Sequence, residues 1–523
     1  MKNFRVRRIH IVCLAIATAE ILIAAFVLWK NAIWNETQIQ TANKQSVLSE
    51  TQEETTSDIQ ENEKTATQNQ EETKPVEEAV ASMPSMRVKL KNSDNTSFEH
   101  AKVIITCPDT FHIQSGTKEQ IFTGGQTVTI TPEHPFFQEG SIRVASEGGF
   151  VIIDSILRRG ISHEYEGVLD LYLSEQGIVI VNELPLEDYV SKVVPSEMPV
   201  SYGLEAAKLQ AVCARTYAYE RILHQKTIDN YGSFADDSVD YQVYNSAGYQ
   251  EISAQGAKLT SGVIMTRDGA PIVPYYFSTS CGYTSDNLAW SGNQTLPYLK
   301  SLNLTGEPDR DMTDEATVSA FLQDQNAAGL ESNMAWYRWR CEIPLDVMQE
   351  LFLKRLPALS ASQSECIKAE GESLEKIIGS TLTSVQVTGR FAGGMASGLK
   401  LKYEKGSVLV TGELVMRKLL SEPNRTYQNK LEETVSLSEG NYLPSAFFCL
   451  IPVMNQDKMT GYVICGGGNG HGIGLSQNCA YQLLEQGKTW QEIHFDSLPC
   501  YCIKCNPLIK IAMTTPLVEM DGD

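Results

Sequence analysis

The composition of the chain changes abruptly near residue 85. Residues 31–85 are rich in Glu, Gln, Thr and Ser, with 11 acidic against 3 basic residues and almost no aromatic side chains. A segment of this kind cannot bury a hydrophobic core, so we expect a disordered acidic linker there. From residue 86 onward, roughly 440 residues carry regular apolar patterning, which is enough for two or three packed units.

An apolar run precedes the linker. Residues 9–29 contain only three ionisable side chains, those of His10, Cys13 and Glu20, and the run is long enough to cross about 30 Å of hydrocarbon. It therefore predicts a retained transmembrane helix rather than a cleaved signal peptide, whose apolar run is usually shorter. Four Lys and Arg residues within residues 1–8 would keep that end in the cytoplasm and place the rest outside the cell membrane.

The patterning after residue 85 predicts an α+β fold rather than a regular alternation of strands and helices. Alternating segments bounded by turn residues predict strands, mainly in the N-terminal half, at 88–91, 103–106, 127–131, 169–173 and 178–181. Helices are predicted at 204–223, 314–324, 346–356, 412–420 and 479–485. We expect these helices to pack on mixed sheets, preceded by the transmembrane helix and the disordered linker.

The segment V-V-P-S-E-M-P at residues 193–199 holds one glutamate, Glu197, between two prolines. Because proline fixes the backbone angle φ near −65° and removes a hydrogen-bond donor, the segment predicts a stiff loop that gives Glu197 a defined direction. That placement is typical of a catalytic acid. The alternative is an exposed turn carboxylate, which is what most glutamates are.

The next segment has the spacing of an amphipathic helix. Apolar residues recur every three or four positions over residues 204–223, which predicts one buried stripe. Lys208 and Arg215 are seven positions apart and therefore project from nearly the same side. Two cations beside the Glu197 carboxylate would hold an anionic or oxygen-rich ligand against the acid. Alternatively, they belong to a solvated helix face.

Three blocks of the sequence resemble the stage II sporulation protein D family, also called SpoIID/LytB. The first is N-E-L-P-L-E-D-Y-V-S-K-V-V-P-S-E-M-P (182–199), which continues through L-E-A-A-K-L-Q-A-V-C-A-R-T-Y-A (204–218). The second is Y-Y-F-S-T-S-C-G-Y-T-S-D-N (275–287), and the third is G-N-G-H-G-I-G-L-S-Q-N-C-A (468–480). Because the blocks follow one another in the family's order over nearly 300 residues, the resemblance is specific.

With this resemblance, the chain is predicted to consist of six parts. They are a cytoplasmic N-terminus (1–8), a transmembrane anchor (9–30), the acidic linker (31–85), the N-terminal part of a SpoIID-like domain with the Glu197 segment (86–302), a variable insertion (303–380), and the C-terminal part of that domain with the Gly-His-Gly motif and a Cys-rich tail (381–523).

The resemblance implies a lytic transglycosylase that acts on peptidoglycan. Ordinary glycosidases use two carboxylates, but here the C6 hydroxyl of N-acetylmuramic acid attacks its own C1 and leaves a 1,6-anhydro end. An intramolecular attack has a large advantage in effective concentration, so one acid suffices. Glu197 would protonate the leaving oxygen and then deprotonate the hydroxyl, provided that apolar neighbours raise its pKa towards neutrality.

The resemblance also implies a set of residues that contact or position the substrate: Ser196, Lys208, Arg215, Ser278, Thr279, Ser280, Tyr283, His471 and Gln477. Structural alternatives exist for most of them. The hydroxyls of residues 278–280 could pair across a sheet, and Arg215 could pack its stem and pair with a surface acid. His471 lies between two glycines, where the backbone can approach a ligand closely, or it satisfies the backbone of a buried loop.

No metal or cofactor is expected. Certain family members bind zinc through a His and two Cys near the segment that corresponds to residues 229–244, and this stretch contains neither residue type. Asp236, Asp237 and Asp240 in this stretch suit calcium or magnesium better than zinc, or simply form a solvated loop. Cys500, Cys502 and Cys505 have close thiol spacing, for which a local disulfide is a simpler interpretation than a metal site.

In this family the activity serves wall remodelling during engulfment of the forespore. The resemblance therefore implies peptidoglycan glycan strands as substrate and other sporulation cell-wall hydrolases as partners in a membrane complex. A formal net charge of −21 without a basic tract argues against nucleic acid as a partner. The alternative is a non-catalytic LytB-type protein that binds wall glycan and stimulates an N-acetylmuramoyl-L-alanine amidase. Such an enhancer could lose Glu197 without harm.

Overall fold

The computed structural model describes residues 84–291, 294–422, 425–436, 442–497 and 502–505. The chain divides into two units, Met1–Ala79 and Val80–Asp523, and all described residues belong to the second unit. The predicted acidic linker, apart from residues 84 and 85, lies outside the described residues.

One part of the predicted fold class needs correction. The prediction placed a transmembrane helix ahead of the domain, but no helix within the described part of the chain is long and apolar enough to cross a bilayer. The run at residues 9–30, on which the prediction depended, lies outside that part. The α+β architecture and the strand-rich N-terminal half are observed as expected.

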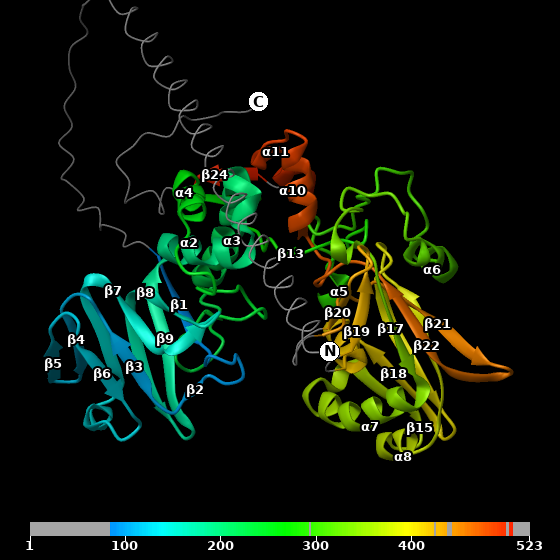
Figure 1. The fold of residues 1–523 in the computed structure, drawn as a ribbon, viewed down its shortest axis with the longest axis horizontal. Helices are drawn as coiled ribbons and strands as arrows, with labels where there is room; N and C mark the ends of the chain where they lie inside the picture. The colour runs from blue at the N-terminus through cyan, green and yellow to red at the C-terminus, as the bar shows by residue number, and fades with distance from the viewer. Residues whose placement is uncertain (1–83, 292–293, 423–424, 437–441, 498–501, 506–523) are drawn as a thin grey trace, which may run out of the picture. The chain divides into compact units, whose positions relative to one another are not determined.

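The N-terminal half is a ten-stranded sheet, in which β1 pairs in parallel with β10 and the other pairs are antiparallel. Its strands are β1 (Ser85–Leu90), β2 (Glu99–His100), β3 (Val103–Thr106), β4 (Phe111–Ser115), β5 (Lys118–Phe122), β6 (Thr127–Ile130), β7 (Ile142–Arg158), β8 (Ile161–Ser174), β9 (Gly177–Pro185) and β10 (Ala235–Asp236). Alternate residues of β1 (Met86, Val88 and Leu90) are buried, as the period of two in a strand requires. Figure 1 shows this sheet in blue and cyan.

Three helices follow the sheet: α2 (Leu186–Glu197) and α3 (Gly203–Leu223), which contact its strands, and α4 (Glu251–Leu259), which packs on both helices. The sequence predicts one buried stripe on α3, but the helix is buried on two sides. One side joins the core of the first sheet through small residues: Ala207, Ala211, Ala214 and Ala218. The other side belongs to a second core: Ala206, Leu209, Val212 and Cys213. A helix that is apolar on both sides must lie inside the protein.

The C-terminal half contains two antiparallel sheets around a third core. One has the order β20-β19-β14-β22-β21, and the other has the order β15-β18-β17-β16. Their strands are β14 (Trp339–Pro344), β15 (Ile367–Gly371), β16 (Leu382–Arg390), β17 (Ala396–Tyr403), β18 (Gly406–Thr411), β19 (Thr426–Asn429), β20 (Thr434–Ser436), β21 (Phe448–Asn455) and β22 (Lys458–Gly466). The helices here are α6 (Glu315–Gln323), α7 (Leu345–Ser362), α8 (Leu374–Ile378) and α9 (Glu413–Leu420).

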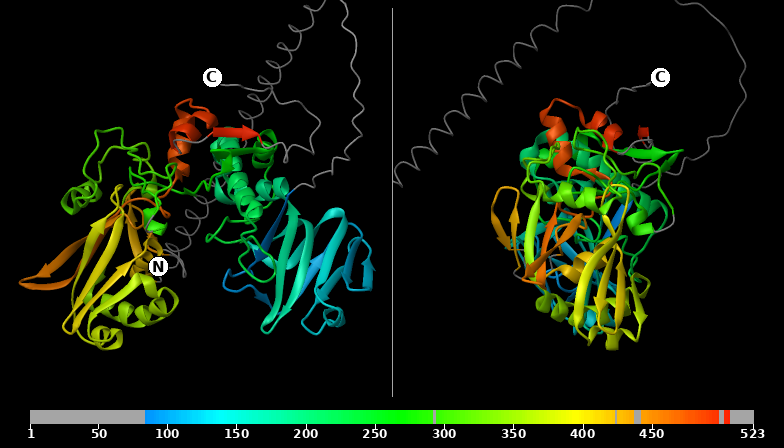
Figure 2. Two further views of the ribbon diagram at one scale, coloured as in Figure 1. Left: turned by 180° about the vertical axis from the view of Figure 1, so that it is seen from behind. Right: turned by 90° about the vertical axis from the view of Figure 1, so that its right-hand side faces the viewer.

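The segments between and after these sheets bring the three sequence blocks together. Strand β13 (Tyr276–Phe277), from the second block, pairs in parallel with β23 (Leu475–Ser476), from the third. Helices α10 (Gln477–Glu485) and α11 (Trp490–Ser497) follow, and both contact α3 from the first block (Figures 1 and 2). The remaining elements are β11 (Val263–Arg267), β12 (Ala270–Pro271), α5 (Leu288–Ser291) and β24 (Cys502–Cys505).

Helix α4 approaches α3 closely at Gly256. A Cβ atom at this position would lie 2.6 Å from Cβ of Ala207 and 2.9 Å from the backbone nitrogen of Lys208. Replacing Gly256 with alanine would therefore push two helix backbones apart, and this outweighs the better helix propensity of alanine.

We expect Gly256→Ala to lower the free energy of unfolding by about 1–3 kcal/mol, measured by thermal or urea denaturation. Gln255→Ala, at an exposed position of the same helix, is the matched control and should be neutral or slightly stabilising. Equal stability of Gly256→Ala and the wild type would contradict the close approach of α3 and α4.

Candidate active site

Glu197 is the last residue of α2. The predicted stiff loop is wrong in this respect, because the helix continues through Pro195. Proline in the final turn removes one backbone hydrogen bond only, and the helix is then ended by Met198, whose backbone is extended (φ −121°, ψ 131°). The direction of Glu197 is nevertheless defined, since it is set by the helix.

A chain of hydrogen bonds ends on the Glu197 carboxylate. The Tyr189 hydroxyl donates to Oε1 of Gln242 (3.1 Å), and Nε2 of Gln242 donates to the Tyr276 hydroxyl (3.0 Å). The Tyr276 hydroxyl in turn donates to Glu197. A further donor is the backbone N–H of Val243, which lies 2.5 Å from Oε1 of Glu197. All donors are therefore aligned towards the carboxylate, and aligned hydrogen bonds strengthen one another.

Two opposing effects set the pKa of Glu197. Burial disfavours the charged form, while the hydrogen bonds from Val243 and Tyr276 favour it. Burial is the larger effect and raises the pKa of Glu197 to about 7, although the residue keeps some exposed surface. A carboxyl group with such a pKa can both give and take a proton near neutral pH.

A cavity of about 700 Å³ lies on the other side of Tyr276 and Gln242. Aromatic side chains dominate its lining: Tyr217, Tyr241, Tyr275, Tyr276, Trp290, Trp336 and Tyr442. Polar and charged groups also line it: Asp240, Gln242, Glu413, Arg417, Asn469 and His471. Glu197 is one hydrogen bond behind this lining, so the acid adjoins the cavity through Tyr276. The mixture of flat aromatic surfaces with a few polar groups is typical of a small-molecule or sugar site.

His471 lines the cavity as a neutral imidazole. Its Nδ1 accepts from the backbone N–H of Ile473 (3.1 Å), so Nε2 carries the proton and donates to the carbonyl of Tyr276 (2.9 Å). Burial lowers the pKa of His471 to about 3, with the charge on Arg417 as a smaller cause. The ring packs against Trp290, with centroids 4.7 Å apart. His471 thus supports the aromatic wall and the strand that carries Tyr276.

The two predicted cations do not lie together at Glu197. Lys208 pairs with Glu205 (2.6 Å) one turn earlier on α3. The Arg215 side chain is completely buried, and its guanidinium forms two bonds to the Glu187 carboxylate, at 2.8 and 2.7 Å. It also donates to the carbonyl of Ala257 (2.9 Å). Arg215 therefore ties α3 to α2 and α4, and acts on Glu197 only through the position of α2.

Ser196 and Gln477 contact the surroundings of Glu197. The Ser196 hydroxyl accepts from the backbone N–H of Ser246 (3.0 Å) and donates to the carbonyl of Lys192 (2.7 Å). Gln477, at the start of α10, donates from Nε2 to the backbone carbonyl of Glu197 (3.2 Å). Both residues hold the end of α2 in place.

The hydroxyl residues of the second block form bonds within the protein. Thr279 accepts from Nδ2 of Asn478 (2.8 Å), and its hydroxyl lies 3.1 Å from that of Ser278. Tyr283 is buried and packs edge-on against Phe321. The predicted alternative, in which these hydroxyls pair across a sheet, differs from this arrangement, because β13 ends before Ser278 and the bond from Asn478 joins a loop to the start of α10.

Glu331 is a buried carboxyl group that the sequence does not signal. It accepts from the backbone N–H of Ser280 (3.0 Å), the Ser280 hydroxyl and the Ser476 hydroxyl (2.7 Å). Burial raises its pKa to about 7. Its partners are 51 and 145 positions away in the chain, so no local pattern could identify them. Glu331 holds β13 beside β23, and thereby Tyr276 beside His471.

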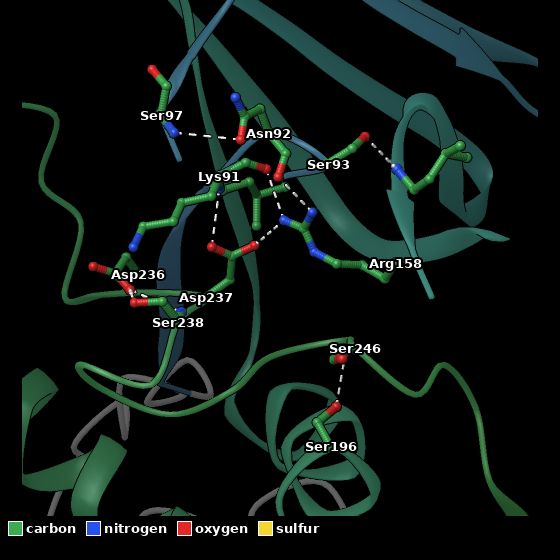
Figure 3. Close-up of polar contacts among 12 residues, drawn as sticks. Lys91, Asn92, Ser93, Ser97, Arg158, Ser196, Asp236, Asp237, Ser238 and Ser246 are labelled. Carbon is green, nitrogen blue, oxygen red and sulfur yellow. Dashed lines mark hydrogen bonds and ion pairs between the residues drawn. The ribbon is translucent and has the colours of Figure 1, made fainter. Parts of the chain in front are cut away.

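Two of the three aspartates considered as hard-metal ligands have internal partners, whereas Asp240 is exposed and lines the cavity. Asp236 accepts from the backbone N–H of Ser238 (2.8 Å), and Asp237 forms a buried ion pair with Arg158 (2.5 Å) (Figure 3). Asp236 and Asp237 are therefore not part of a solvated loop, while residues 239 and 240 are exposed. Cys500 lies outside the described residues, and only the backbone of Cys502 and Cys505 is described, in β24.

Comparison with known proteins supports the family resemblance. The SpoIID family, described as stage II sporulation protein, matches residues 174–269. A second family, described as a domain of unknown function (DUF8618), matches residues 285–474. The first match contains Glu197 and α3, and the second contains Trp290, Trp336 and α9 on the cavity wall.

Curated relatives agree with the family matches. The chain is 38% identical over 135 residues to the stage II sporulation protein D of Bacillus amyloliquefaciens, which covers 23% of this chain and 39% of that protein. It is 26% identical over 304 residues to the amidase enhancer of Bacillus subtilis, which covers 58% of this chain and 38% of that protein. An uncharacterized protein of Brachyspira hyodysenteriae is 32% identical over 175 residues, covering 33% of this chain and 46% of that protein. The chain thus spans less than half the length of these relatives.

The raised pKa of Glu197 predicts a pH-dependent difference in stability between the wild type and Glu197→Gln. The folded-state pKa, about 7, lies above the ordinary value of 4.5, so the folded protein binds more protons than the unfolded chain between these pH values. Its stability falls as the pH rises through this window. Glutamine keeps an oxygen for the Val243 N–H but has no charge to bury. We therefore expect Glu197→Gln to be more stable than the wild type at pH 8, by up to about 3 kcal/mol, and nearly equal at pH 5.

Thermal denaturation at the two pH values checks this expectation. Glu205→Gln, on the exposed end of α3, is the control, and its change in stability relative to the wild type should be the same at pH 5 and pH 8. A difference for Glu197→Gln that does not depend on pH would contradict the raised pKa.

Proposed function

We propose that the chain, which carries a SpoIID-family domain at residues 174–269, is a lytic transglycosylase that cleaves peptidoglycan glycan strands during cell-wall remodelling in sporulation. The observation that supports this most is the carboxyl group of Glu197, with a pKa of about 7, directly behind the wall of an aromatic-lined cavity. We place the protein outside the cytoplasmic membrane, where this substrate lies.

Glu197 suits an acid that works twice. In the first step its proton passes to the glycosidic oxygen as the bond to C1 of N-acetylmuramic acid breaks. In the second step the carboxylate takes the proton of the C6 hydroxyl as that oxygen bonds to C1, so no water is consumed and the acid is restored. The Val243 N–H and the Tyr276 hydroxyl stabilise the carboxylate that exists between the two steps. Both steps need a pKa near the working pH.

The cavity offers surfaces for sugar rings. Trp290 is 42% exposed on the cavity wall. Its ring packs edge-on against Tyr275 and at a tilt against His471. An exposed indole held in this way can stack on the apolar face of a pyranose without losing much conformational freedom. Of the charged groups of the lining, Glu413 and Arg417 pair with each other (2.6 Å), and Asp240 is exposed. The cavity therefore offers an oxygen-rich ligand polar contacts without an excess of positive charge.

The test is product analysis by mass spectrometry. The full chain and its Glu197→Gln variant are incubated with intact peptidoglycan and with glycan strands freed of stem peptides by an amidase. We expect 1,6-anhydromuramyl ends with the wild type, and a loss of at least 100-fold in their rate of formation with the variant, as is typical for removal of a general acid and base (about 10²–10⁴-fold). Reducing ends in place of anhydro ends would indicate a hydrolase and contradict the proposal.

A second candidate function is that of a non-catalytic protein that binds wall glycan and stimulates an amidase. The alignment with the amidase enhancer of Bacillus subtilis favours it, because it extends over 304 residues, compared with 135 for the stage II sporulation protein D alignment. If this candidate function is right, the wild type and Glu197→Gln both form no anhydro ends. Both proteins then bind the wall and raise the rate of an N-acetylmuramoyl-L-alanine amidase. Association with other wall hydrolases belongs to the same proposal.

We expect Trp290→Ala to weaken the binding of N-acetylglucosamine-containing glycan oligomers about fivefold or more, because stacking on an aromatic ring contributes on the order of 1 kcal/mol or more. Isothermal titration calorimetry with Glu197→Gln as background measures binding without turnover. Tyr249→Ala is the matched control, since Tyr249 is an exposed aromatic residue (62%) that does not line the cavity. Equal affinities of all three proteins would contradict a glycan site in this cavity.

A further inference from the structure

The segment from Asp237 to Ala247 connects the first sheet to the surroundings of Glu197. Its residues 239–242 line the cavity, and the next residue, Val243, donates its backbone N–H to Glu197 (2.5 Å). No helix or strand occurs within these described residues. A segment without regular structure needs other contacts to keep a peptide group in one place.

The start of the segment is fixed by a buried ion pair. Asp237 accepts from Nη2 of Arg158 (2.5 Å) through one carboxylate oxygen, and from the backbone N–H of Lys91 (3.0 Å) through the other. Arg158, the last residue of β7, also donates to the carbonyls of Lys91 (2.7 Å) and Asn92 (2.8 Å). Figure 3 shows the carboxylate of Asp237 between the guanidinium of Arg158 and the backbone of Lys91. The side chains of Arg158 and Asp237 are 5% and 1% exposed.

The end of the segment is fixed to α2 itself. The Ser196 hydroxyl accepts from the backbone N–H groups of Ser246 (3.0 Å) and Ala247 (3.4 Å). Ser196 precedes Glu197 in the chain, and Figure 3 shows it below Ser246. Between the two ends, the Tyr244 hydroxyl donates to Oδ1 of Asn182 on β9 (2.6 Å). Val243 is therefore held from both sides.

We propose that the Arg158–Asp237 ion pair is a positioning device for the active site: it fixes the segment 237–247 so that the Val243 N–H stays on the Glu197 carboxylate and residues 239–242 keep the cavity wall. The predicted effect of the ion pair on catalysis rests on the proposed function. Its effect on the hydrogen bond between Val243 and Glu197 does not.

The placement of this ion pair favours positioning over stability as its role. Burying two charges has a large desolvation penalty, so a buried pair adds little net stability compared with an apolar pair of similar volume. What it does provide is one defined geometry, because each charge must face its partner and fill its remaining hydrogen bonds. Here the remaining bonds go to the backbone of Lys91 and Asn92, which fixes the segment to the first sheet in a single register.

The measurable consequence concerns the protonation of Glu197. Loss of the Val243 donor removes one of the two hydrogen bonds that favour the charged form, while burial continues to oppose it. The titratable groups that face Glu197 are the hydroxyls of Tyr276 and Tyr189, whose pKa values burial raises well above the usual range. They stay neutral throughout, so a change in the pKa of Glu197 reports on the segment.

The experiment measures the pKa of Glu197 directly in the full-length protein. Side-chain carboxyl carbons of glutamate are labelled with ¹³C, and the Glu197 resonance is assigned from its absence in Glu197→Gln. We expect Arg158→Met and Ser196→Ala, which release opposite ends of the segment, each to raise the pKa of Glu197 by about one pH unit. The rate of anhydro-product formation should fall about tenfold, mainly in kcat rather than in KM.

Two further variants separate positioning from folding. The double variant Arg158→Met/Asp237→Leu replaces the pair by apolar residues and should recover the thermal midpoint, but not the pKa of Glu197. Arg390→Met removes a guanidinium that is likewise buried and pairs with Glu315 in another core. It should lower stability and leave the pKa of Glu197 unchanged.

Folded Arg158→Met, Ser196→Ala or double variants in which Glu197 titrates as in the wild type would overturn the inference. Absence of anhydro products from the wild type would overturn the proposed function only, since the titration of Glu197 is read without any substrate.

Discussion

Helix α3 has to be covered on two sides, and this requirement determines how the parts of the domain meet. Its alanine side is covered by the first sheet and α2, whereas its larger apolar side is covered by β11, α10 and α11. The last two helices come from the far end of the chain. Arg215, buried in the middle of α3, bonds to Glu187 and so sets the distance to α2. The three sequence blocks are neighbours because a helix without a polar face has to be enclosed.

This enclosure places Glu197 where two opposing effects nearly balance. Packing around the end of α2 removes water and disfavours the carboxylate, whereas the Val243 N–H and the aligned hydrogen bonds through Gln242 and Tyr276 favour it. Because an effective dielectric constant lower than that of water strengthens both effects, small displacements of a donor change the balance strongly. The buried contacts that fix these donors are consequently as important to the site as the carboxyl group itself.

The sequence predicts the local features well and the distant partners poorly. Helix α3 and the strands β1, β3 and β9 occur where the sequence predicts them, and in β1 and β3 the buried residues alternate with a period of two. The predicted stripe of α3 is its alanine side, and the second side, with Leu209, Val212 and Cys213, is covered by helices from the far end of the chain, which no local spacing reveals. Glu331, Trp290 and the Arg158–Asp237 pair depend on partners far along the chain, and no spacing within a segment encodes them. The prolines beside Glu197 predict a loop, because proline usually interrupts a helix. Here the helix continues through Pro195, since proline in the last turn removes only one hydrogen bond.

The energetics of Glu197 bear on the choice between an enzyme and an amidase enhancer. A carboxyl group with a pKa of about 7 destabilises the fold at neutral pH relative to a glutamine or an apolar residue of similar size. Glu331 has the same pKa of about 7 and joins segments of the fold, so the raised pKa alone does not separate the two functions. What favours an acid is that Glu197 lies one hydrogen bond behind the aromatic lining of a cavity, whereas neither Glu331 nor its bonded partners line it. A general acid requires a raised pKa, and local features that reduce stability are usually kept where chemistry needs them.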